Sequence, residues 1–308
     1  MSNIQVWCLG DVVVDLLPDG PQRYRQCPGG APANVAVALS RLNIATGFIG
    51  CRGGDPFGQF MNDTLVQEGI NTEHLVVDEA HLTSTVLVSL DAHGERQFTF
   101  LVNPSADQFL QSAYLPQFQA GQWLQLSSIA LAGEVSRTST KYAMAKAKQC
   151  DAKIFFDVNI RPSLWTDEAC MITTIQSVLP FCDVVKVSEE EAFLLTGEAG
   201  LTQALTSLAS MTPALLVVTM GALGAKVLDT TKWLDIPACD GVQVVDSTGA
   251  GDGFVGGMLS VLAKTSVWRQ SDVIERAVRL GNRVGAFVVT QKGAMSALPT
   301  EQQLECCC

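Results

Sequence analysis

Short apolar stretches alternate with longer segments of helical periodicity along most of the chain. The apolar stretches are almost continuously hydrophobic, which is typical of strands that are buried on both faces of a sheet. Strands are therefore predicted at residues 4–9, 46–50, 123–129, 153–157, 183–187, 214–219 and 242–246. Helices are predicted between them, at residues 31–42, 55–69, 134–149 and 271–293. This alternation indicates an α/β fold with a mostly parallel, doubly wound sheet between two layers of helices.

Residues 83–102 break the alternation. They form two short strand patterns around the turn DAHGE at 91–95, with no helix between them. Such a hairpin either belongs to a second sheet that closes over a site or lies at an edge of the main sheet, and the pattern leaves both open. The 308 residues suffice for one large α/β domain with an elaboration or for two small domains, and no repeat or low-complexity linker divides them.

The segment STGAGDG at 247–253 combines glycines with an acidic residue before a helix. Gly249 and Gly251 allow close approach of a ligand to the backbone, where free N–H groups and a helix N-terminus favour anions. Asp252 could simply cap the helix, but a capping turn needs about one glycine. An Asp beside a bound phosphate can accept the proton of an attacking hydroxyl. The segment therefore predicts phosphoryl transfer from ATP to an alcohol.

A second glycine pair, at Gly29 and Gly30, precedes the helix predicted at 31–42 and its Asn34. Backbone amides and an amide side chain suit sugar hydroxyls. Asp11 and Asp15 follow the first strand and offer carboxylate acceptors, although acids near a turn are equally often solvated surface. These residues are the candidate sugar site.

Three further segments follow predicted strands. Arg161 is a candidate phosphate ligand, and the turn with Thr219, Gly221 and Gly224 is either a nucleotide-side turn or an ordinary β-turn. Ser188 and Glu191 have the spacing of a capping box, which explains both residues without a metal.

The composition of the chain and the absence of several motifs argue against some classes of function. The net charge is −11 without a basic stripe, which argues against nucleic acid as the main ligand. No apolar run reaches the length of a membrane span, and the N-terminus lacks the pattern of a signal peptide, so a cytoplasmic protein with reduced thiols is expected. The CCC at 306–308 is interpreted as a frayed tail. No Walker loop or dinucleotide fingerprint occurs, and the three histidines have no metal-ligand spacing.

Two long segments identify a resemblance that covers essentially the whole chain. The segments GGAPANVAVALSRLNIATGFIGCRGGDPFG at 29–58 and DSTGAGDGFVGGM at 246–258 resemble the ribokinase-like carbohydrate kinases of the phosphofructokinase-B group. Within that family, GDVVVDLLP, CPGGAPANVA, KVSEEE and QKGAMSALP are most similar to the bacterial members that phosphorylate fructose.

The resemblance implies a role for each candidate residue. It implies a single domain over 1–308, an α/β sandwich with a β lid formed from about 12–27 and 83–103. Asp252 would be the general base, and the amides of Gly249, Ala250 and Gly251 the anion hole. The sugar would be bound by Asp11, Asp15, Gly29, Gly30, Asn34, Phe98, Phe100 and Arg161, and the nucleotide by Lys186, Thr219, Gly221 and Gly224. Glu191 matches the glutamate of the family's Mg2+ motif, in which Ser188 replaces the usual Asn. Asp246, Thr248, Val288 and Gly293 match a monovalent-cation site.

The activity implied is ATP-dependent phosphorylation of fructose at its 6-hydroxyl, with Mg2+ and K+ as ions and a homodimer formed through the lid. A kinase of another sugar or of a nucleoside is the alternative, since Phe98 and Phe100 hint at an apolar pocket. A sugar sensor without catalysis is disfavoured because Asp252 and its glycine loop are intact.

Overall fold

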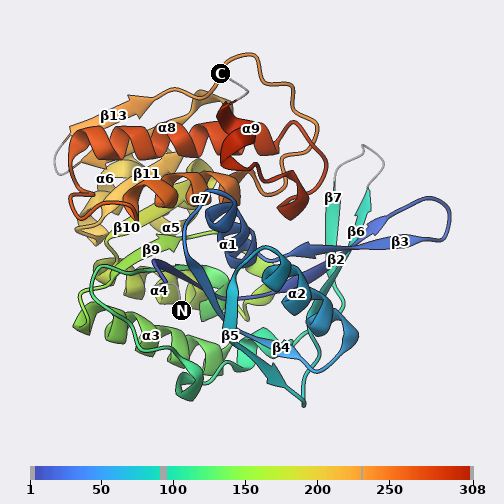
Figure 1. Ribbon diagram of the computed structural model, residues 1–308. Helices are drawn as coiled ribbons and strands as arrows, with labels where there is room; N and C mark the ends of the chain where they lie inside the picture. Colours follow the sequence, from blue (N-terminus) through green and yellow to red (C-terminus); the bar gives the residue numbers. More distant parts are fainter. Residues whose placement is uncertain (1–3, 91–95, 230–231, 306–308) are drawn as a thin grey trace.

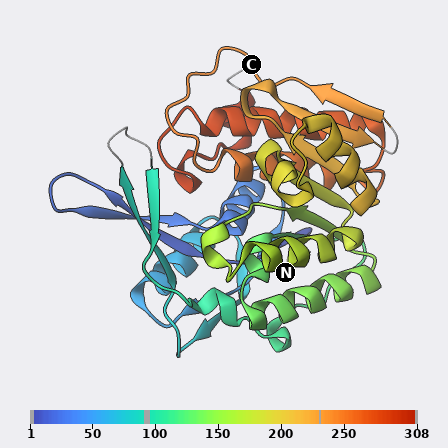
Figure 2. The ribbon, with the colours of Figure 1, turned by 180° about the vertical axis from the view of Figure 1, so that it is seen from behind.

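The computed structural model describes residues 4–90, 96–229 and 232–305. A central sheet runs through the molecule with helices on both faces (Figures 1 and 2). Its strands lie in the spatial order β13 (Lys232–Ile236), β12 (Ala225–Asp229), β11 (Leu215–Thr219), β10 (Val184–Ser188), β9 (Lys153–Asp157), β8 (Trp123–Ser127), β1 (Val6–Leu9), β4 (Thr46–Gly53) and β5 (Asn71–Asp78). Neighbouring strands are parallel from β5 to β11, and β12 is antiparallel to both of its neighbours.

The helices pack in two layers, one on each face of the central sheet. They are α1 (Ala31–Arg41), α2 (Pro56–Gln67), α3 (Glu134–Gln149), α4 (Glu168–Val178), α5 (Glu189–Thr196), α6 (Leu201–Met211), α7 (Ala250–Leu262), α8 (Ser271–Val288) and the short α9 (Glu301–Glu305). Buried residues of α1, α2, α7 and α8 join one core, and those of α3 to α6 join the other. The predicted three-layer, doubly wound fold is confirmed.

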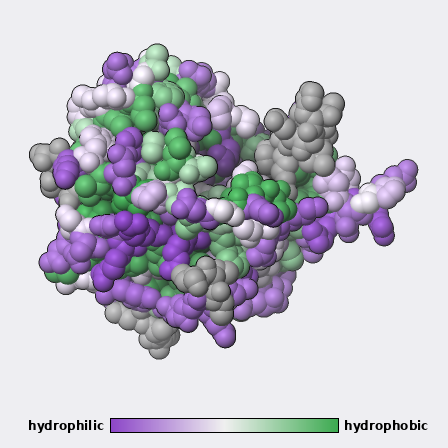
Figure 3. Space-filling view, turned by 90° about the horizontal axis from the view of Figure 1, so that it is seen from above, coloured by the Kyte–Doolittle hydropathy of each residue, from purple (hydrophilic) through white to green (hydrophobic). Residues whose placement is uncertain are grey.

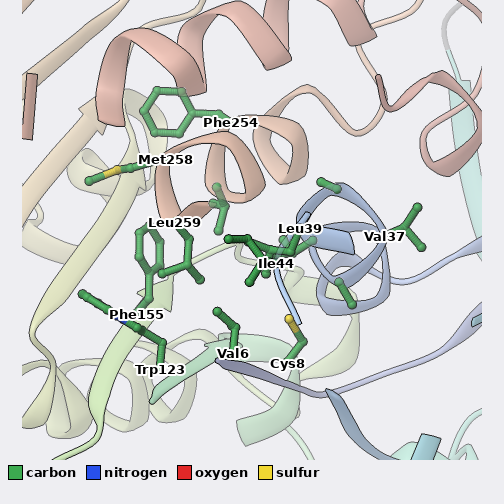
Figure 4. Packing of buried hydrophobic residues seen from close by; sticks show 14 of the residues in the cluster. Val6, Cys8, Val37, Leu39, Ile44, Trp123, Phe155, Phe254, Met258 and Leu259 are labelled. Carbon is green, nitrogen blue, oxygen red and sulfur yellow. The ribbon is translucent and has the colours of Figure 1, made fainter. Parts of the chain in front are cut away.

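Strand β1 shows why its sequence is almost continuously apolar. Val6 and Cys8 point into the core beneath α1 and α7, whereas Trp7 and Leu9 point into the opposite core. Successive side chains of a strand alternate between faces, so a strand covered on both sides needs apolar residues at every position. Figure 4 shows Phe254 and Leu259 of α7 packed over the first of these cores.

A second, four-stranded sheet, which we call the lid sheet, stands beside the central one. Its order is β3 (Tyr24–Gly29), β2 (Val13–Pro18), β6 (Ser84–Leu90) and β7 (Arg96–Phe100). The 83–102 hairpin therefore belongs to a second sheet; its turn at 91–95 lies outside the described residues. The β2–β3 hairpin projects beyond the rest of the molecule, with a mostly hydrophilic tip (Figures 1 and 3).

The lid sheet has two unlike faces. Val14 and Leu16 of β2 pack against the main core, whereas Val13, Val86 and Val88 form a small separate cluster on the other face. Because β2 follows β1 after a three-residue connection, the chain crosses from the central sheet to the lid sheet at Gly10, Asp11 and Val12. Asp11 therefore lies at the junction of the two sheets.

One predicted strand and the predicted end of one helix were wrong. Residues 242–246 form no strand, and Val244 and Val245 are 69% and 56% exposed. The place next to β11 is taken by β12, so this segment crosses the surface as a loop. The last long helix, predicted to 293, ends at Val288 because the following residues form a turn that Asp246 holds through the Gly293 N–H, 2.8 Å away.

The helix starts predicted from capping residues were confirmed. Asp55 caps α2 by accepting the N–H groups of Phe57 and Gly58 at 2.9 and 3.0 Å. Ser188 and Glu191 form the predicted capping box at the start of α5.

In the described part of the chain, no helix combines the length and apolar character needed to cross a membrane. Cys306–Cys308 lie outside that part.

Candidate active site

The glycine loop leads directly into α7. Gly249 has a φ of 79°, and a Cβ at this position would lie only 2.7 Å from the Cβ of Ala294. Both constraints require glycine. The N–H groups of Gly251 and Asp252 lie in the first turn of α7, where no helical acceptor is within reach. The N–H groups of Gly251 and Asp252 therefore give the loop the backbone geometry of an anion site, whereas the N–H of Ala250 donates to the carbonyl of Ser247 at 3.2 Å.

Asp252, the third residue of α7, lies beside this anion site. Its Oδ2 accepts a hydrogen bond of 2.7 Å from the Nδ2 of Asn34 on α1. The two helices approach closely: a Cβ on Gly256 would lie 2.4 Å from the Cβ of Ala38. Burial raises the pKa of Asp252 above its usual value, and Arg161 and Lys186 oppose this rise. A carboxylate with a raised pKa is better matched to accepting a proton near neutral pH.

Asp11 is the second carboxylate of this region. It is 5% exposed, and its Oδ1 has no hydrogen-bond partner among the described residues. Burial, together with the charge of Asp107, raises the pKa of Asp11 to about 7. The Oδ1 of Asn34 is likewise buried without a partner. Buried polar atoms without partners are rare in proteins, and here they gather at the junction of the two sheets.

The two glycines before α1 allow close packing of the backbone against neighbouring residues. Gly30 has a φ of 100°, and a Cβ there would lie 2.5 Å from the carbonyl oxygen of Asp11. Gly29 belongs to β3, where the carboxylate of Asp15 lies against its Cα. That these two glycines also present amides to a sugar stays a prediction.

A large cleft separates the lid sheet from the loops around α7. Its volume is about 850 Å³. Asp15 and Arg25 line it from the lid, and Asp246, Thr248 and Lys292 line it from the other side. Phe100 packs against the valine cluster of the lid sheet. Phe98 pairs with Val88 through the backbone, but its side chain lies outside what the structure describes.

A separate cleft of about 540 Å³ opens on the other side of the glycine loop. Thr219, Gly221 and Gly224 line it, as the nucleotide-side interpretation requires, and Ala250 and Gly251 form its inner end. Its remaining lining is largely apolar and includes Ala238, Val242, Val244, Phe254, Ala286 and Val289. The hydroxyl of Thr219 donates to the carbonyl of Val187 at 3.3 Å. An apolar cleft that ends at an anion site suits a nucleotide.

Lys186 lies beneath the glycine loop in a buried ion pair. Its Nζ is 2.9 Å from the Oδ1 of Asp157, and the two side chains are 7% and 2% exposed. Burial alone would lower the pKa of Lys186, but the carboxylates of Asp157 and Glu191 outweigh it and raise the pKa. The ammonium group is therefore retained at neutral pH.

Arg161 and Glu191 occupy the loop after β9 and the start of α5. Arg161 is exposed, and its charge opposes the rise of the pKa of both Asp11 and Asp252, which places it near the two carboxylates. Both oxygens of Glu191 accept backbone N–H groups at 2.8 Å, from Ser188 and Ile160. Among the described residues, no group of three His, Cys, Asp or Glu side chains could enclose a metal ion. If Glu191 bound Mg2+ directly, its carboxylate would have to share its lone pairs between the metal ion and these N–H groups.

The expected cation residues lie together in two touching loops. Asp246 accepts from the N–H and hydroxyl of Thr248 at 3.1 and 2.7 Å and from the N–H of Gly293. The N–H of Asp246 donates to the carbonyl of Val289, next to Val288 at the end of α8. The candidate cation residues therefore lie together, but both oxygens of Asp246 already accept hydrogen bonds, and a role for these residues toward K+ stays a prediction.

Sequence reasoning missed Asp157 and Asp107. Asp157 ends the strand KIFFD, and an acidic residue at the carboxyl end of a buried parallel strand is a usable signal. Asp107 sits in a short 3-10 helix (Ala106–Phe109), where burial raises its pKa. No local pattern distinguishes it from a surface acid.

A helix-borne carboxylate beside an anion loop and a group of buried polar side chains, with a largely apolar cleft lined by the same loop, defines a phosphotransferase that acts on a small alcohol. The pattern of the pfkB family carbohydrate kinases matches residues 4–301, and the chain belongs to this family.

Individual relatives are similar over almost their whole length. A fructokinase of Escherichia coli is 47% identical over 304 residues, which are 98% of this chain and 99% of that protein. The crystal structure of fructokinase from Vibrio cholerae O395 in its fructose, ADP and calcium ion bound form superimposes with a TM-score of 0.94 at 47% identity, over 98% of both chains. Aminoimidazole riboside kinase from Salmonella enterica, complexed with aminoimidazole riboside and an ATP analog, gives 0.92 at 34% identity, again over 98% of both chains.

Proposed function

We propose that this protein is a fructokinase that transfers the γ-phosphoryl group of ATP to the 6-hydroxyl of D-fructose. One observation carries the proposal: the Asp252 carboxylate lies beside the anion loop of α7 and accepts a hydrogen bond of 2.7 Å from Asn34, a residue of the proposed sugar site. In this proposal one side chain would reach both reactants. Fructokinases are also the relatives that match at 45–47% identity.

The chemistry follows from this placement. The fructose hydroxyl gives its proton to Asp252 while its oxygen forms a bond to the γ-phosphorus. The bond between that phosphorus and the bridging oxygen breaks, and its electrons stay on the β-phosphate of ADP. The N–H groups of the first turn of α7 stabilise the charge on the transferring group. Products are fructose 6-phosphate, ADP and the proton released from Asp252.

The sugar pocket and the nucleotide cleft meet at the glycine loop. Asp11, Asp15, Gly29, Gly30 and Asn34 would bind the sugar hydroxyls, with Arg161 over the junction. Thr219, Gly221 and Gly224 would border the nucleotide, in the apolar cleft of about 540 Å³. Closure of the lid sheet over the larger cleft would exclude water, which competes with the sugar as phosphoryl acceptor.

Two ions complete the proposal. Mg2+ would enter with the nucleotide and neutralise its phosphate charge, and Glu191 would act on it through water because both of its oxygens already accept N–H groups. K+ would be held by Asp246, Thr248, Val288 and Gly293, where its charge supports the anion loop. Both assignments rest on the donor atoms present.

The lid supports a proposal about assembly. β3 and β7 are the edge strands of the lid sheet, and the β2–β3 hairpin projects from the molecule (Figure 1). Edge strands offer unpaired backbone groups to a second sheet, so two copies would pair through their lids. The seven described cysteines are all free, which fits a reducing cytoplasm.

An ADP-coupled assay with a panel of sugars tests the function. Fructose should give the highest kcat/KM, and omission of K+ should lower the rate. Ribose and aminoimidazole riboside test the alternative acceptors, which the riboside kinase at 38% identity makes specific. Strong turnover on the riboside with none on fructose would overturn the proposed substrate.

A further inference from the structure

One carboxylate joins the lid sheet to the rest of the fold. Asp55, between β4 and α2, uses its two oxygens for different partners. Its Oδ1 accepts the N–H groups of Phe57 and Gly58 and so caps α2. Its Oδ2 accepts the N–H of Thr83 at 2.7 Å and the hydroxyl of the same residue at 2.9 Å. A helix cap needs only the first oxygen, so the bonds of the second to a residue 28 positions away require a separate explanation.

Thr83 is fixed in place by its surroundings. It is 1% exposed, and its hydroxyl also accepts the N–H of Gly53 at 3.1 Å. A Cβ on Gly53 would clash with the Oδ2 of Asp55, and a Cβ on Gly58 would lie 2.7 Å from the Thr83 hydroxyl. We call Gly53, Asp55, Gly58 and Thr83 the lid anchor. Hydrogen bonds to a carboxylate are roughly twice as strong as neutral ones, so the lid anchor is a firm joint.

The lid anchor lies at the base of the lid sheet. Thr83 directly precedes β6, whose first residue, Ser84, pairs with Val13 at the start of β2. The chain that leaves β7 returns to the same level, where the N–H of Ala106 donates to the carbonyl of Leu82 at 2.9 Å. Strands β2, β6 and β7 are therefore all attached to the rest of the fold along one line.

This line adjoins the proposed sugar site. Strand β2 enters the lid sheet through residues 10–12, which include Asp11. Further along β2, Asp15 pairs with Val86 of β6 and lines the cleft of about 850 Å³. Because β2 and β6 are hydrogen-bonded neighbours, a shift of β6 at its base is transmitted to Asp15. The lid anchor thus acts on a sugar-site residue that it does not touch.

We propose that Asp55 and Thr83 are positioning residues for the sugar: they fix the base of the lid sheet and thereby set the place of Asp15 over the cleft. This proposal rests on the proposed fructokinase function and deepens it. A positioning error of about 1 Å can cost on the order of 10²-fold in rate. A loosened lid would weaken sugar binding and admit water as a competing acceptor. The nucleotide cleft would be unaffected, because residues between 219 and 289 line it.

Steady-state kinetics of Thr83→Val and Asp55→Asn test this role. Thr83→Val removes the hydroxyl and keeps the branched side chain, and Asp55→Asn leaves one acceptor oxygen for two sets of partners. Each variant should raise KM for fructose about tenfold, the effect of one lost hydrogen bond to a charged group, and should change KM for ATP less than about twofold. The ADP formed per sugar phosphate should exceed that of the wild type. Thr83→Ser keeps the hydroxyl and should restore both values.

Thr212→Val is the matched control. Thr212 is also buried, at 7% exposed, and lies just before β11. Its hydroxyl donates to the carbonyl of Leu179 at 2.7 Å and accepts the N–H of Ala214 at 3.1 Å, so it too both donates and accepts. The control should lower the thermal midpoint as Thr83→Val does and keep both KM values. Hydrogen exchange followed by mass spectrometry should become faster in β6 for Thr83→Val only.

Three outcomes would overturn the proposal. A lower thermal midpoint with an unchanged KM for fructose would make the lid anchor a structural contact only. An equal rise of both KM values would indicate a general distortion of the fold. Unchanged exchange in β6 would show that the anchor does not hold the lid. If Asp55→Asn does not fold, the Thr83 variants alone decide. Failure of the wild-type protein to phosphorylate any sugar would instead contradict the proposed function.

Discussion

Asp11, which we propose as a sugar ligand, lowers the stability of the fold by an amount that can be measured. Its pKa rises from 3.8 to about 7 in the folded protein, first through burial and second through the charge of Asp107. Between these two pH values the folded protein holds more protons at this site than the unfolded chain. The free energy of unfolding therefore falls as pH rises through this window. At 1.36 kcal/mol per pKa unit, the cost is on the order of 4 kcal/mol above pH 7.

Asp11→Asn removes the charge and keeps the shape. At pH 5 Asp11 is protonated in the folded protein, and it lowers the free energy of unfolding by only about 1.5 kcal/mol. At pH 8 Asp11 is ionised, and the loss of unfolding free energy has reached about 4 kcal/mol. Relative to wild type, the variant should therefore gain roughly 2–3 kcal/mol between pH 5 and pH 8. Urea unfolding at both pH values measures this gain. The affinity for fructose should fall, because a carboxylate acceptor is lost.

Asp55→Asn is the matched control. Hydrogen bonds of the α2 cap, which outweigh burial, lower the pKa of Asp55, so the folded and unfolded forms are both ionised at pH 5 and pH 8. Its stability change should be the same at the two pH values. The gain of Asp11→Asn should also shrink when Asp107→Asn is present. A stability difference for Asp11→Asn that does not depend on pH would refute the reasoning.

Three further substitutions test other parts of the site. Gly249→Ala should lower the thermal midpoint and the activity, because the new Cβ would clash with Ala294. Gly121→Ala is its control: Gly121 has a φ of 82° and open space around it, so this variant should show only the backbone strain of roughly 1–2 kcal/mol. Equal effects of the two substitutions would contradict the clash. Asp246→Ala should raise the K+ concentration needed for half-maximal rate, and an unchanged K+ titration would exclude this site. Ala286→Phe should fill the nucleotide cleft and raise KM for ATP but not for fructose, which initial-rate kinetics would show; equal changes in both would place the nucleotide elsewhere.

Much of the fold was predictable because its signals are local. Strands covered on both faces, such as residues 153–157, are uniformly apolar, and the Asp55 cap and the 188–191 capping box depend on neighbouring residues only. The segment 242–246 failed because apolar residues that line a cleft resemble those of a buried strand. Strands β12 and β13 were missed because an antiparallel edge pair lacks a helix partner.

The site was predictable where motifs are contiguous and unpredictable where tertiary contacts decide. The glycine loop and Asp252 lie in seven consecutive residues. The pair of Asp157 and Lys186 depends on the register of two strands, and the influence of Asp107 on Asp11 depends on how a short helix packs. Neither relation leaves a trace in local sequence.

Asp252→Asn, studied with fructose and ATP, tests the central claim most directly. The substitution keeps the size of the side chain and removes the base, so kcat should fall by about 10²–10⁴. ADP affinity, measured by calorimetry, should change less than about threefold, since the N–H groups of α7 remain in place. Turnover close to that of the wild type would contradict the assignment of Asp252 as the base that activates the sugar hydroxyl.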